Sequence, residues 1–140
     1  MKRRYIFSGI AIVLFGAVLW LFLWGPSTKA SNLELALGIT ELPPSVEIVG
    51  EAIDSWTDHI SHHSITLDPD DFELLLAGRP FKKIESIQLG TMKHGGYMSN
   101  LPAIDVAEKY EVQELEENGV WCSVYVNESW TEAYVFYAVD

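Results

Sequence analysis

The pattern of hydrophobic and polar positions divides the chain into two unequal parts. Residues 5–24 are almost entirely apolar, and no charged side chain lies between Arg4 and Lys29. As a helix, this segment would be about 30 Å long, which is the thickness of the hydrocarbon core of a bilayer. It is longer than the apolar region of a cleaved signal peptide, which usually has about 7–15 residues. We therefore predict a transmembrane signal-anchor helix over residues 5–24, with a signal peptide cleaved after Ala30 as the alternative.

Basic residues lie mainly on one side of this segment. Lys2, Arg3 and Arg4 precede it, whereas Lys29 alone follows closely. Lys and Arg beside a membrane span tend to remain in the cytoplasm. The pattern predicts a bacterial inner (plasma) membrane protein with a basic cytoplasmic N-terminus, residues 1–4, and a periplasmic or extracellular C-terminal domain.

The pattern after the apolar segment indicates a linker and then one domain. Residues 31–39 fit either a short strand or an amphipathic turn that rests on the domain. Pro43 and Pro44 then impose extended backbone. We expect a linker and membrane-proximal segment at residues 25–41 and an acidic domain at residues 42–140, because about 100 residues suffice for one hydrophobic core.

The first part of this domain has the alternation that is typical of β-strands. Residues 46–50 alternate between apolar and polar, and residues 55–67 contain several β-branched side chains without signals for a helix. We predict two antiparallel strands in these segments, joined by a turn at residues 51–54.

Signals for the start of a helix follow directly. The Asp68 carboxylate can accept hydrogen bonds from the free amides of a first turn, and Pro69 suits the first helical position. Apolar residues then recur at helical spacing, and Gly78 marks an end. The pattern predicts a short helix over residues 69–77.

Alternation returns in the C-terminal third, at residues 110–115, 120–126 and 132–139. Asn118 and Gly119 between the first two segments are a strong hairpin signal. Three consecutive antiparallel strands form a β-meander. The predicted fold class is therefore α+β: an N-terminal transmembrane helix is followed by a small domain with an antiparallel β-sheet, built from two strands, a helix and the C-terminal three-strand meander.

Acidic side chains dominate the chain after its apolar segment. The formal net charge is −11, and from Ser31 onward five basic side chains stand against all twenty acidic ones, which gives −15. A field of this sign repels nucleic acid and attracts basic proteins, and it also serves solubility. As partners we predict the membrane, through its single span, and a basic protein, with solubility alone as the alternative; we predict no nucleic acid.

One cluster of side chains points to metal chemistry. Residues 58–63 (DHISHH) combine imidazole and carboxylate groups, which are usual zinc ligands. On a strand, however, His59 and His63 share one face and His62 lies on the other, so neither face has enough ligands for a tetrahedral site. His94 could supply another ligand from a glycine-rich loop. The candidate metal ligands are His59, His62, His63 and His94, and solvated or hydrogen-bonded strand residues are the alternative.

Nucleophilic catalysis has less support. The serines, which include Ser61, Ser64, Ser86 and Ser99, do not lie in a G-x-S-x-G turn. Cys122 is the single cysteine, so it cannot form an internal disulfide, and its apolar neighbours favour burial in a strand. We assign no catalytic residue and no cofactor.

The order of these features resembles small exported or membrane-anchored bacterial proteins of uncharacterised function. The resemblance rests on the membrane segment, residues 42–45 (LPPS), the strand pair, residues 68–72 (DPDDF) and the terminal residues 135–137 (VFY). It implies a bacterial exported domain and carries no catalytic residue to this chain.

Two functional hypotheses follow. The leading one is a non-enzymatic protein-interaction module held at the membrane, such as an envelope accessory or an immunity-like protein. The alternative is a small metal-dependent enzyme that uses His59, His62 and His63 with His94. Three ligands that converge beside an open cavity would favour the enzyme, whereas an exposed apolar or acidic patch without convergent imidazoles would favour the interaction module.

Overall fold

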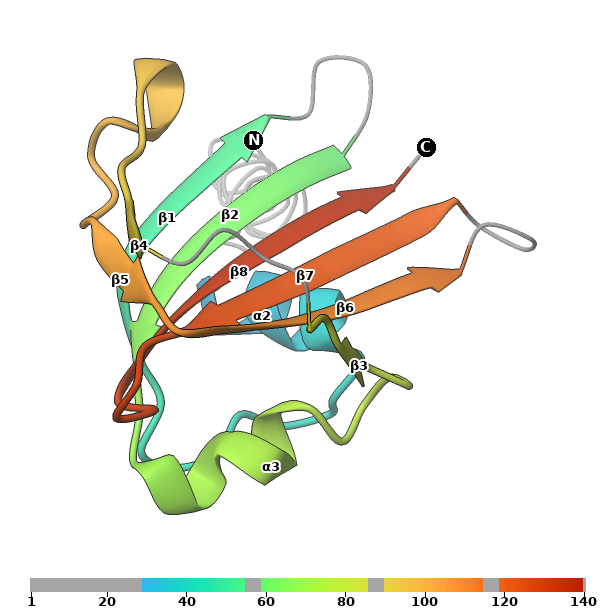
Figure 1. Ribbon diagram of the computed structural model, residues 1–140. Helices are drawn as coiled ribbons and strands as arrows, with labels where there is room; N and C mark the ends of the chain where they lie inside the picture. The colour runs from blue at the N-terminus through green and yellow to red at the C-terminus, as the bar shows by residue number, and fades with distance from the viewer. Residues whose placement is uncertain (1–28, 55–58, 86–89, 115–118, 140) are drawn as a thin grey trace, which may run out of the picture.

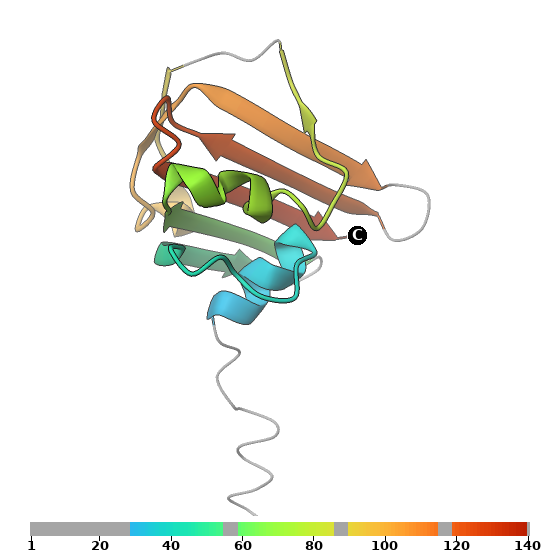
Figure 2. The same ribbon diagram turned by 90° about the horizontal axis from the view of Figure 1, so that it is seen from below.

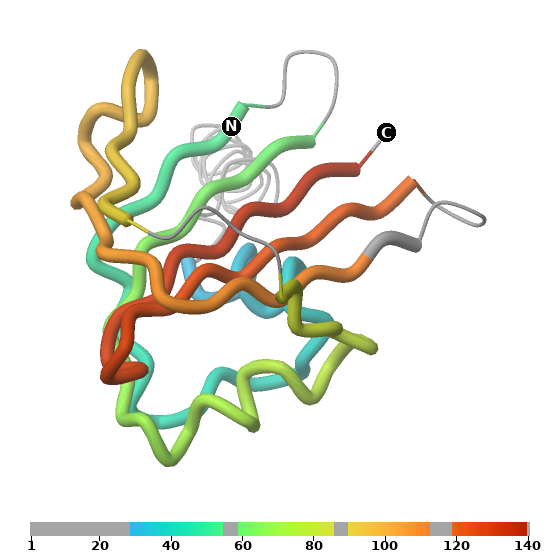
Figure 3. The backbone as a smooth tube through the Cα atoms, in the orientation of Figure 1, coloured from blue at the N-terminus to red at the C-terminus, as the bar shows by residue number. Residues whose placement is uncertain are grey.

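Strands dominate the computed structural model (Figures 1 and 3). It describes residues 29–54, 59–85, 90–114 and 119–139. In chain order, the elements are α2 (Lys29–Leu37), β1 (Glu47–Asp54), β2 (His59–Thr66), the 3₁₀ turn η1 (Pro69–Asp71), α3 (Phe72–Leu75), β3 (Lys82–Lys83), β4 (Gly90–Met92), the 3₁₀ turn η2 (Gly96–Met98), β5 (Ile104–Val106), β6 (Glu108–Glu114), β7 (Val120–Val126) and β8 (Glu132–Val139).

Six of the strands form one antiparallel sheet. Their order is β1-β2-β8-β7-β6-β3, and β4 pairs with β5 in a separate two-stranded ribbon. The C-terminal strand β8 lies between β2 and β7, and it pairs with β2 from His59 opposite Val139 to Thr66 opposite Glu132. The C-terminal strand therefore lies inside the sheet, beside a strand from the N-terminal half of the chain.

The two faces of the sheet have different coverings (Figure 2). On the side that we call the helix face, α2 and α3 cover the main hydrophobic core, which includes Ile65, Val124 and Val135. On the opposite side, residues 90–106 fold back over the sheet; we call this segment the strap and this side the strap face. A smaller apolar cluster lies beneath the strap, around Tyr134.

The helix α2 belongs to the core, which agrees with the amphipathic turn that was one of the two alternatives for residues 31–39 and not with the strand. Leu33, Ala36 and Leu37 are fully buried, and their spacing places them on one helical face toward the sheet. The helix ends at Gly38, whose φ of 71° is the left-handed conformation that glycine adopts readily. Arg79 donates hydrogen bonds to the carbonyl oxygens of Leu35 and Ala36, at 3.0 and 2.9 Å. The segment that we expected to be a linker is thus packed and capped.

The start of the second helical segment is confirmed. The Asp68 carboxylate accepts a hydrogen bond from the Asp70 amide at 3.2 Å, and Pro69 occupies the first position of η1. Ser45 joins this start to the preceding loop, because its hydroxyl accepts from the Asp68 amide at 3.0 Å and donates to the Asp71 carboxylate at 2.6 Å.

Replacing Asp68 by Ala is expected to lower the free energy of unfolding by about 1 kcal/mol, since the Asp70 amide loses its capping acceptor. Urea unfolding of the full chain, followed by tryptophan fluorescence, measures this change. Asp70→Ala is the matched control, because it removes a neighbouring carboxylate that is not the cap. Equal midpoints for the two variants would show that the cap does not stabilise this turn.

The predicted α+β fold class with a transmembrane helix is corrected by the structure. The described residues are mostly β-sheet with two short helices, because most of their apolar positions alternate with period two and pair in one six-stranded sheet. No helix among them is long and apolar enough to cross a membrane. The segments predicted as a basic N-terminus, residues 1–4, and as a membrane span, residues 5–24, lie outside the described residues. The predicted cellular location stays a prediction.

Several predicted boundaries also change. The turn expected at residues 51–54 is wrong, because β1 continues to Asp54 and stays paired with β2 up to Ile60. The second helical segment ends at Leu75, before the close contact of Gly78 with α2: a Cβ atom at Gly78 would lie 2.4 Å from the Leu37 carbonyl oxygen. The bounds of β7 and β8 coincide with those predicted.

Candidate binding site

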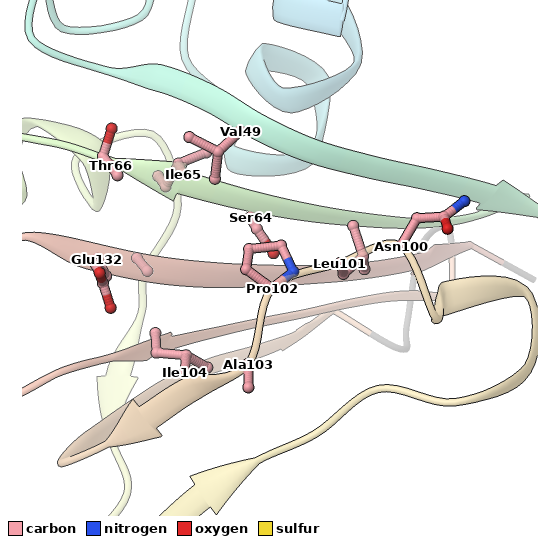
Figure 4. A pocket seen from close by; sticks show the side chains of 11 residues that line it. Val49, Ser64, Ile65, Thr66, Asn100, Leu101, Pro102, Ala103, Ile104 and Glu132 are labelled. Atoms are coloured by element: carbon pink, nitrogen blue, oxygen red, sulfur yellow. The ribbon is translucent and has the colours of Figure 1, made fainter.

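A cavity of about 490 Å³ lies between the strap and the sheet (Figure 4). Its volume falls within the range of about 300–1,000 Å³ that is typical of ligand pockets. Most of the side chains around it are apolar, and they come from β1, β2, β8 and the strap. The lining residues are Val49, Ser64, Ile65, Thr66, Asn100, Leu101, Pro102, Ala103, Ile104, Glu132 and Ala133.

One buried polar atom of the cavity lacks a partner. Ser64 lies on β2 and is 5% exposed, and its hydroxyl makes no hydrogen bond within the described part of the chain. A buried hydroxyl without a partner destabilises a protein by roughly 1–3 kcal/mol, so such groups normally have one. The Ser64 hydroxyl is therefore available to hydrogen-bond a group that enters the cavity.

The cavity depends on a close approach of the strap to β1. A Cβ atom at Gly50 would lie 2.9 Å from Leu101 Cδ2, so the absence of a side chain there lets the strap approach. Next to Gly50, the β1 ladder contains a bulge, and Val49 at this bulge is 49% exposed on the rim of the cavity. Glu132 is the one charged residue in the lining, and it is acidic.

A hydrogen-bonded chain of side chains also lies on the strap face. His62 Nε2 is 2.8 Å from the Tyr97 hydroxyl, and His62 Nδ1 is 2.5 Å from the Tyr134 hydroxyl. The Tyr134 hydroxyl in turn donates to Met98 Sδ at 3.9 Å. A neutral imidazole donates from one ring nitrogen and accepts at the other, so His62 bridges the Tyr97 and Tyr134 hydroxyls. These hydrogen bonds hold η2 of the strap against β2 and β8 of the sheet.

His94 completes this cluster. Its ring centroid lies 4.5 Å from that of Tyr134, and its Nε2 is buried without a hydrogen-bond partner among the described residues. Burial lowers the pKa of His94, and burial together with the nearby His94 lowers the pKa of His62. Both imidazoles are therefore neutral at pH 7.

His63 lies on the helix face in a different network. Its Nε2 is 3.1 Å from the Ser61 hydroxyl and its Nδ1 is 3.5 Å from a Glu51 carboxylate oxygen. The Asn32 amide of α2 donates to the same carboxylate at 3.1 Å. The order of hydroxyl, imidazole and carboxylate is that of a serine hydrolase triad. Ser61 and His63 are completely buried, however, so a substrate cannot reach the hydroxyl and the network serves packing.

The structure separates the four histidines that the sequence indicated as metal ligands. His59 and His63 face the helix side, where His59 contacts the Tyr137 ring, whereas His62 and His94 lie on the strap face. In the described ranges, no three His, Cys, Asp or Glu residues are placed to hold a metal ion. Their separation follows from the strand alternation on which the sequence argument was based.

Cys122 is buried in β7, as its apolar neighbours predicted. Burial raises the pKa of its thiol to about 12, so the group stays protonated and is a poor nucleophile at neutral pH.

The sequence did not single out the cavity. Ser64 was considered only as a nucleophile, and no pattern predicted that residues 100–104 would fold over it. The alternation of β2 does place Ser64 on the same face as His62, which was the one available signal for the cavity.

Comparisons of the chain with protein-family models, with curated proteins and with solved structures found no match.

Proposed function

We propose that the protein is a non-enzymatic protein-interaction module, and that its strap-face cavity receives an apolar side chain from a basic segment of a partner protein. The observation that supports this function is the largely apolar cavity with the unpartnered Ser64 hydroxyl at its wall. An apolar side chain supplies the burial, and a polar group of the partner backbone satisfies the hydroxyl.

The composition of the lining favours binding over catalysis. Ser64 is the one buried hydroxyl in the cavity, and the lining contains no imidazole, thiol or lysine that could activate it. His62 and His94 belong to the neighbouring hydrogen-bonded cluster and are not among the lining residues. No observation on the described residues favours the metal-dependent enzyme.

Charge supports the choice of a basic partner. The chain from Ser31 onward has a formal charge of −15, and the cavity itself carries Glu132 at its margin. Opposite charge on the partner accelerates association and selects the partner, and both effects weaken as salt rises. The binding is therefore expected to be sensitive to ionic strength.

Filling the cavity is expected to abolish binding. The probe is acetyl-Leu-Lys-amide, which joins one apolar side chain to one positive charge and is too short to form a strand. In the full chain, Ala103→Trp should reduce its affinity at least tenfold without unfolding, because Ala103 is exposed at the margin of the cavity. Amide chemical shifts in a titration locate the probe and measure its affinity.

Ala77→Trp is the matched control, because Ala77 is also an exposed alanine but lies among the residues at the C-terminal ends of α2 and α3. It should leave the affinity unchanged. Shift changes outside the cavity, or equal affinities in the two variants, would overturn the proposed function.

A further inference from the structure

We propose that the strap is a pH-sensitive wall of the cavity: the neutral imidazoles of His62 and His94 hold it against the sheet, and their protonation releases it. This inference rests on the proposed function, because it states how binding in the same cavity is regulated. The two imidazoles come from opposite sides of the contact, since His62 belongs to β2 and His94 belongs to the strap.

The strap forms one wall of the cavity. Residues 100–104 are five of the eleven lining residues, and they lie opposite the Ser64 side chain (Figure 4). They directly follow η2, because the Leu101 amide donates a hydrogen bond to the Met98 carbonyl oxygen at 2.9 Å. If the strap leaves the sheet, it therefore removes this wall of the cavity.

The two imidazoles pack around the ring of Tyr134. The His62 ring is stacked with it at a centroid distance of 6.0 Å, and the His94 ring lies 4.5 Å from it. Tyr97 of η2 contacts the His62 ring at 5.7 Å and is hydrogen-bonded to it. The strap therefore meets the sheet at groups that can take up protons.

Protonation disturbs both imidazoles in the closed strap. His94 Nε2 is buried without a partner, so a proton there is an N–H group without an acceptor among the described residues. Neutral His62 accepts a hydrogen bond at one ring nitrogen, whereas the protonated ring donates from both. The Tyr97 or Tyr134 hydroxyl that donates to the neutral ring must then turn and accept instead.

The apolar cluster beneath the strap contains no acidic residue that could neutralise the added charge. The other titratable or basic groups on this side are Lys93 and Tyr97 of the strap, Tyr134 of β8, Tyr125 of β7 and Lys109 of β6, which lies over the Tyr125 ring. His59 and His63 of β2 lie on the helix face. Two protonated imidazoles therefore repel each other in a partly buried cluster.

The carboxylates of the neighbouring elements lie elsewhere. Glu51 of β1 is beside His63 on the helix face, Glu111 of β6 pairs with Lys109, and Asp105 of β5 accepts a hydrogen bond from Thr91. The side chains of Asp54, at the end of β1, and Glu132, at the margin of the cavity, are exposed. Solvent screens their attraction for a proton in the cluster.

The pKa shifts have the sign that this device requires. Burial lowers the pKa of both His62 and His94 in the closed strap, and His94 lowers that of His62 further. In a released strap, both rings meet water and their pKa values return toward the ordinary value of about 6.5. The released state then binds protons more tightly than the closed state. Release is therefore favoured increasingly as the pH falls below about 6.5.

The first test measures release by amide hydrogen exchange in the full chain, with rates corrected for the intrinsic effect of pH. Between pH 7.5 and pH 5.5, the protection factor of the Leu101 amide is expected to fall at least threefold more than that of the Val124 amide. Val124 is completely buried in the central strand β7, so its amide reports unfolding of the whole domain, including the effect of His63. Equal falls would overturn release of the strap.

Two variants test the imidazoles. His94→Phe keeps a ring beside Tyr134 that cannot be protonated, and it is expected to reduce the extra fall at Leu101 by at least half. His62→Gln keeps a hydrogen-bonding group and should also reduce it. His59→Phe is the matched control, because His59 also contacts a tyrosine ring, that of Tyr137, but on the helix face. It should leave the fall unchanged, and an unchanged fall in His94→Phe or in His62→Gln would overturn the proposal.

The second test connects release with binding. The probe acetyl-Leu-Lys-amide has no group that titrates between pH 7.5 and pH 5.5. Its affinity is expected to be at least threefold lower at pH 5.5, and His94→Phe should retain the higher affinity at that pH. Equal affinity of the unchanged chain at the two pH values would overturn regulation of the cavity by the strap.

The two tests separate this proposal from the proposed function. If the probe binds at neither pH but the Leu101 amide responds as expected, the pH-sensitive strap is supported and the cavity loses its proposed function. If the probe binds equally at both pH values and the Leu101 amide does not respond, the cavity retains its proposed function and the pH-sensitive strap is overturned.

Discussion

Replacing Phe72 by Ala is expected to lower the free energy of unfolding by about 3–5 kcal/mol, the usual range for removing a buried phenylalanine ring. Phe72 is 2% exposed and begins α3. Its ring centroid lies 5.4 Å from that of Tyr110 on β6 and 5.2 Å from that of Trp130 in the turn before β8. The ring therefore joins the helical segment to β6 and to the turn before β8, and its removal leaves a cavity among these three parts.

The neighbouring Leu74 provides the control for this experiment. It lies on the same helix but is 57% exposed, so Leu74→Ala should change the free energy of unfolding by less than about 1 kcal/mol. Urea unfolding of both variants and of the unchanged chain measures the two differences. Similar losses for Phe72→Ala and Leu74→Ala would contradict the packing of α3 against the sheet.

Local sequence signals predicted those elements whose causes are local. The Asp68 cap depends on neighbouring residues, and it has the predicted partner. The alternation in β7 and β8 gave correct bounds because each strand has one face in the core. The same alternation predicted that His59 and His63 would lie apart from His62.

The sequence predictions were wrong where contacts between residues far apart in the sequence determine the local structure. Leu33, Leu35 and Leu37 alternate as in a strand, yet Leu33, Ala36 and Leu37 are buried as a helical face, and Leu35 is 56% exposed. That choice depends on the sheet that covers the helix and on Arg79, which caps it. The helix predicted over residues 69–77 was too long for a related reason, because α3 ends at Leu75, before Gly78 meets α2.

The cavity could not be predicted from any single segment. Its walls come from β1 and β2, from the C-terminal strand β8 and from a strap without a clear pattern. Gly50 has a role that only the structure reveals, since its lack of a side chain allows the contact with Leu101.

The two faces of the sheet have different roles: the packed helix face provides stability, and the strap face, with its cavity, provides the proposed binding site. Substitutions on the helix face are thus expected to change stability, and those at the cavity to change binding.

The stability of the fold is expected to fall as the pH falls from about 6.5 to about 4, and His63 is the cause. Burial lowers the pKa of His63 from its ordinary value of 6.5 to about 4, although the Glu51 carboxylate from β1 acts in the opposite direction and His62 and His59 of its own strand act in the same direction. Between these two pH values the unfolded chain binds a proton at His63 and the folded chain does not. Protonation therefore favours the unfolded state, and the free energy of unfolding decreases by roughly 2–3 kcal/mol over this interval.

The variant His63→Gln isolates this contribution, because glutamine can keep a hydrogen bond to Ser61 but does not titrate. Its free energy of unfolding at pH 7 is expected to be lower than that of the unchanged chain, since the fit beneath α2 is altered. Its further loss between pH 7 and pH 4.5 should be smaller by about 2 kcal/mol. Urea unfolding at several pH values measures both slopes, and parallel slopes would show that His63 is not the group that titrates. His94→Gln on the strap face should retain most of the pH dependence, because the completely buried His63 remains beneath the helix.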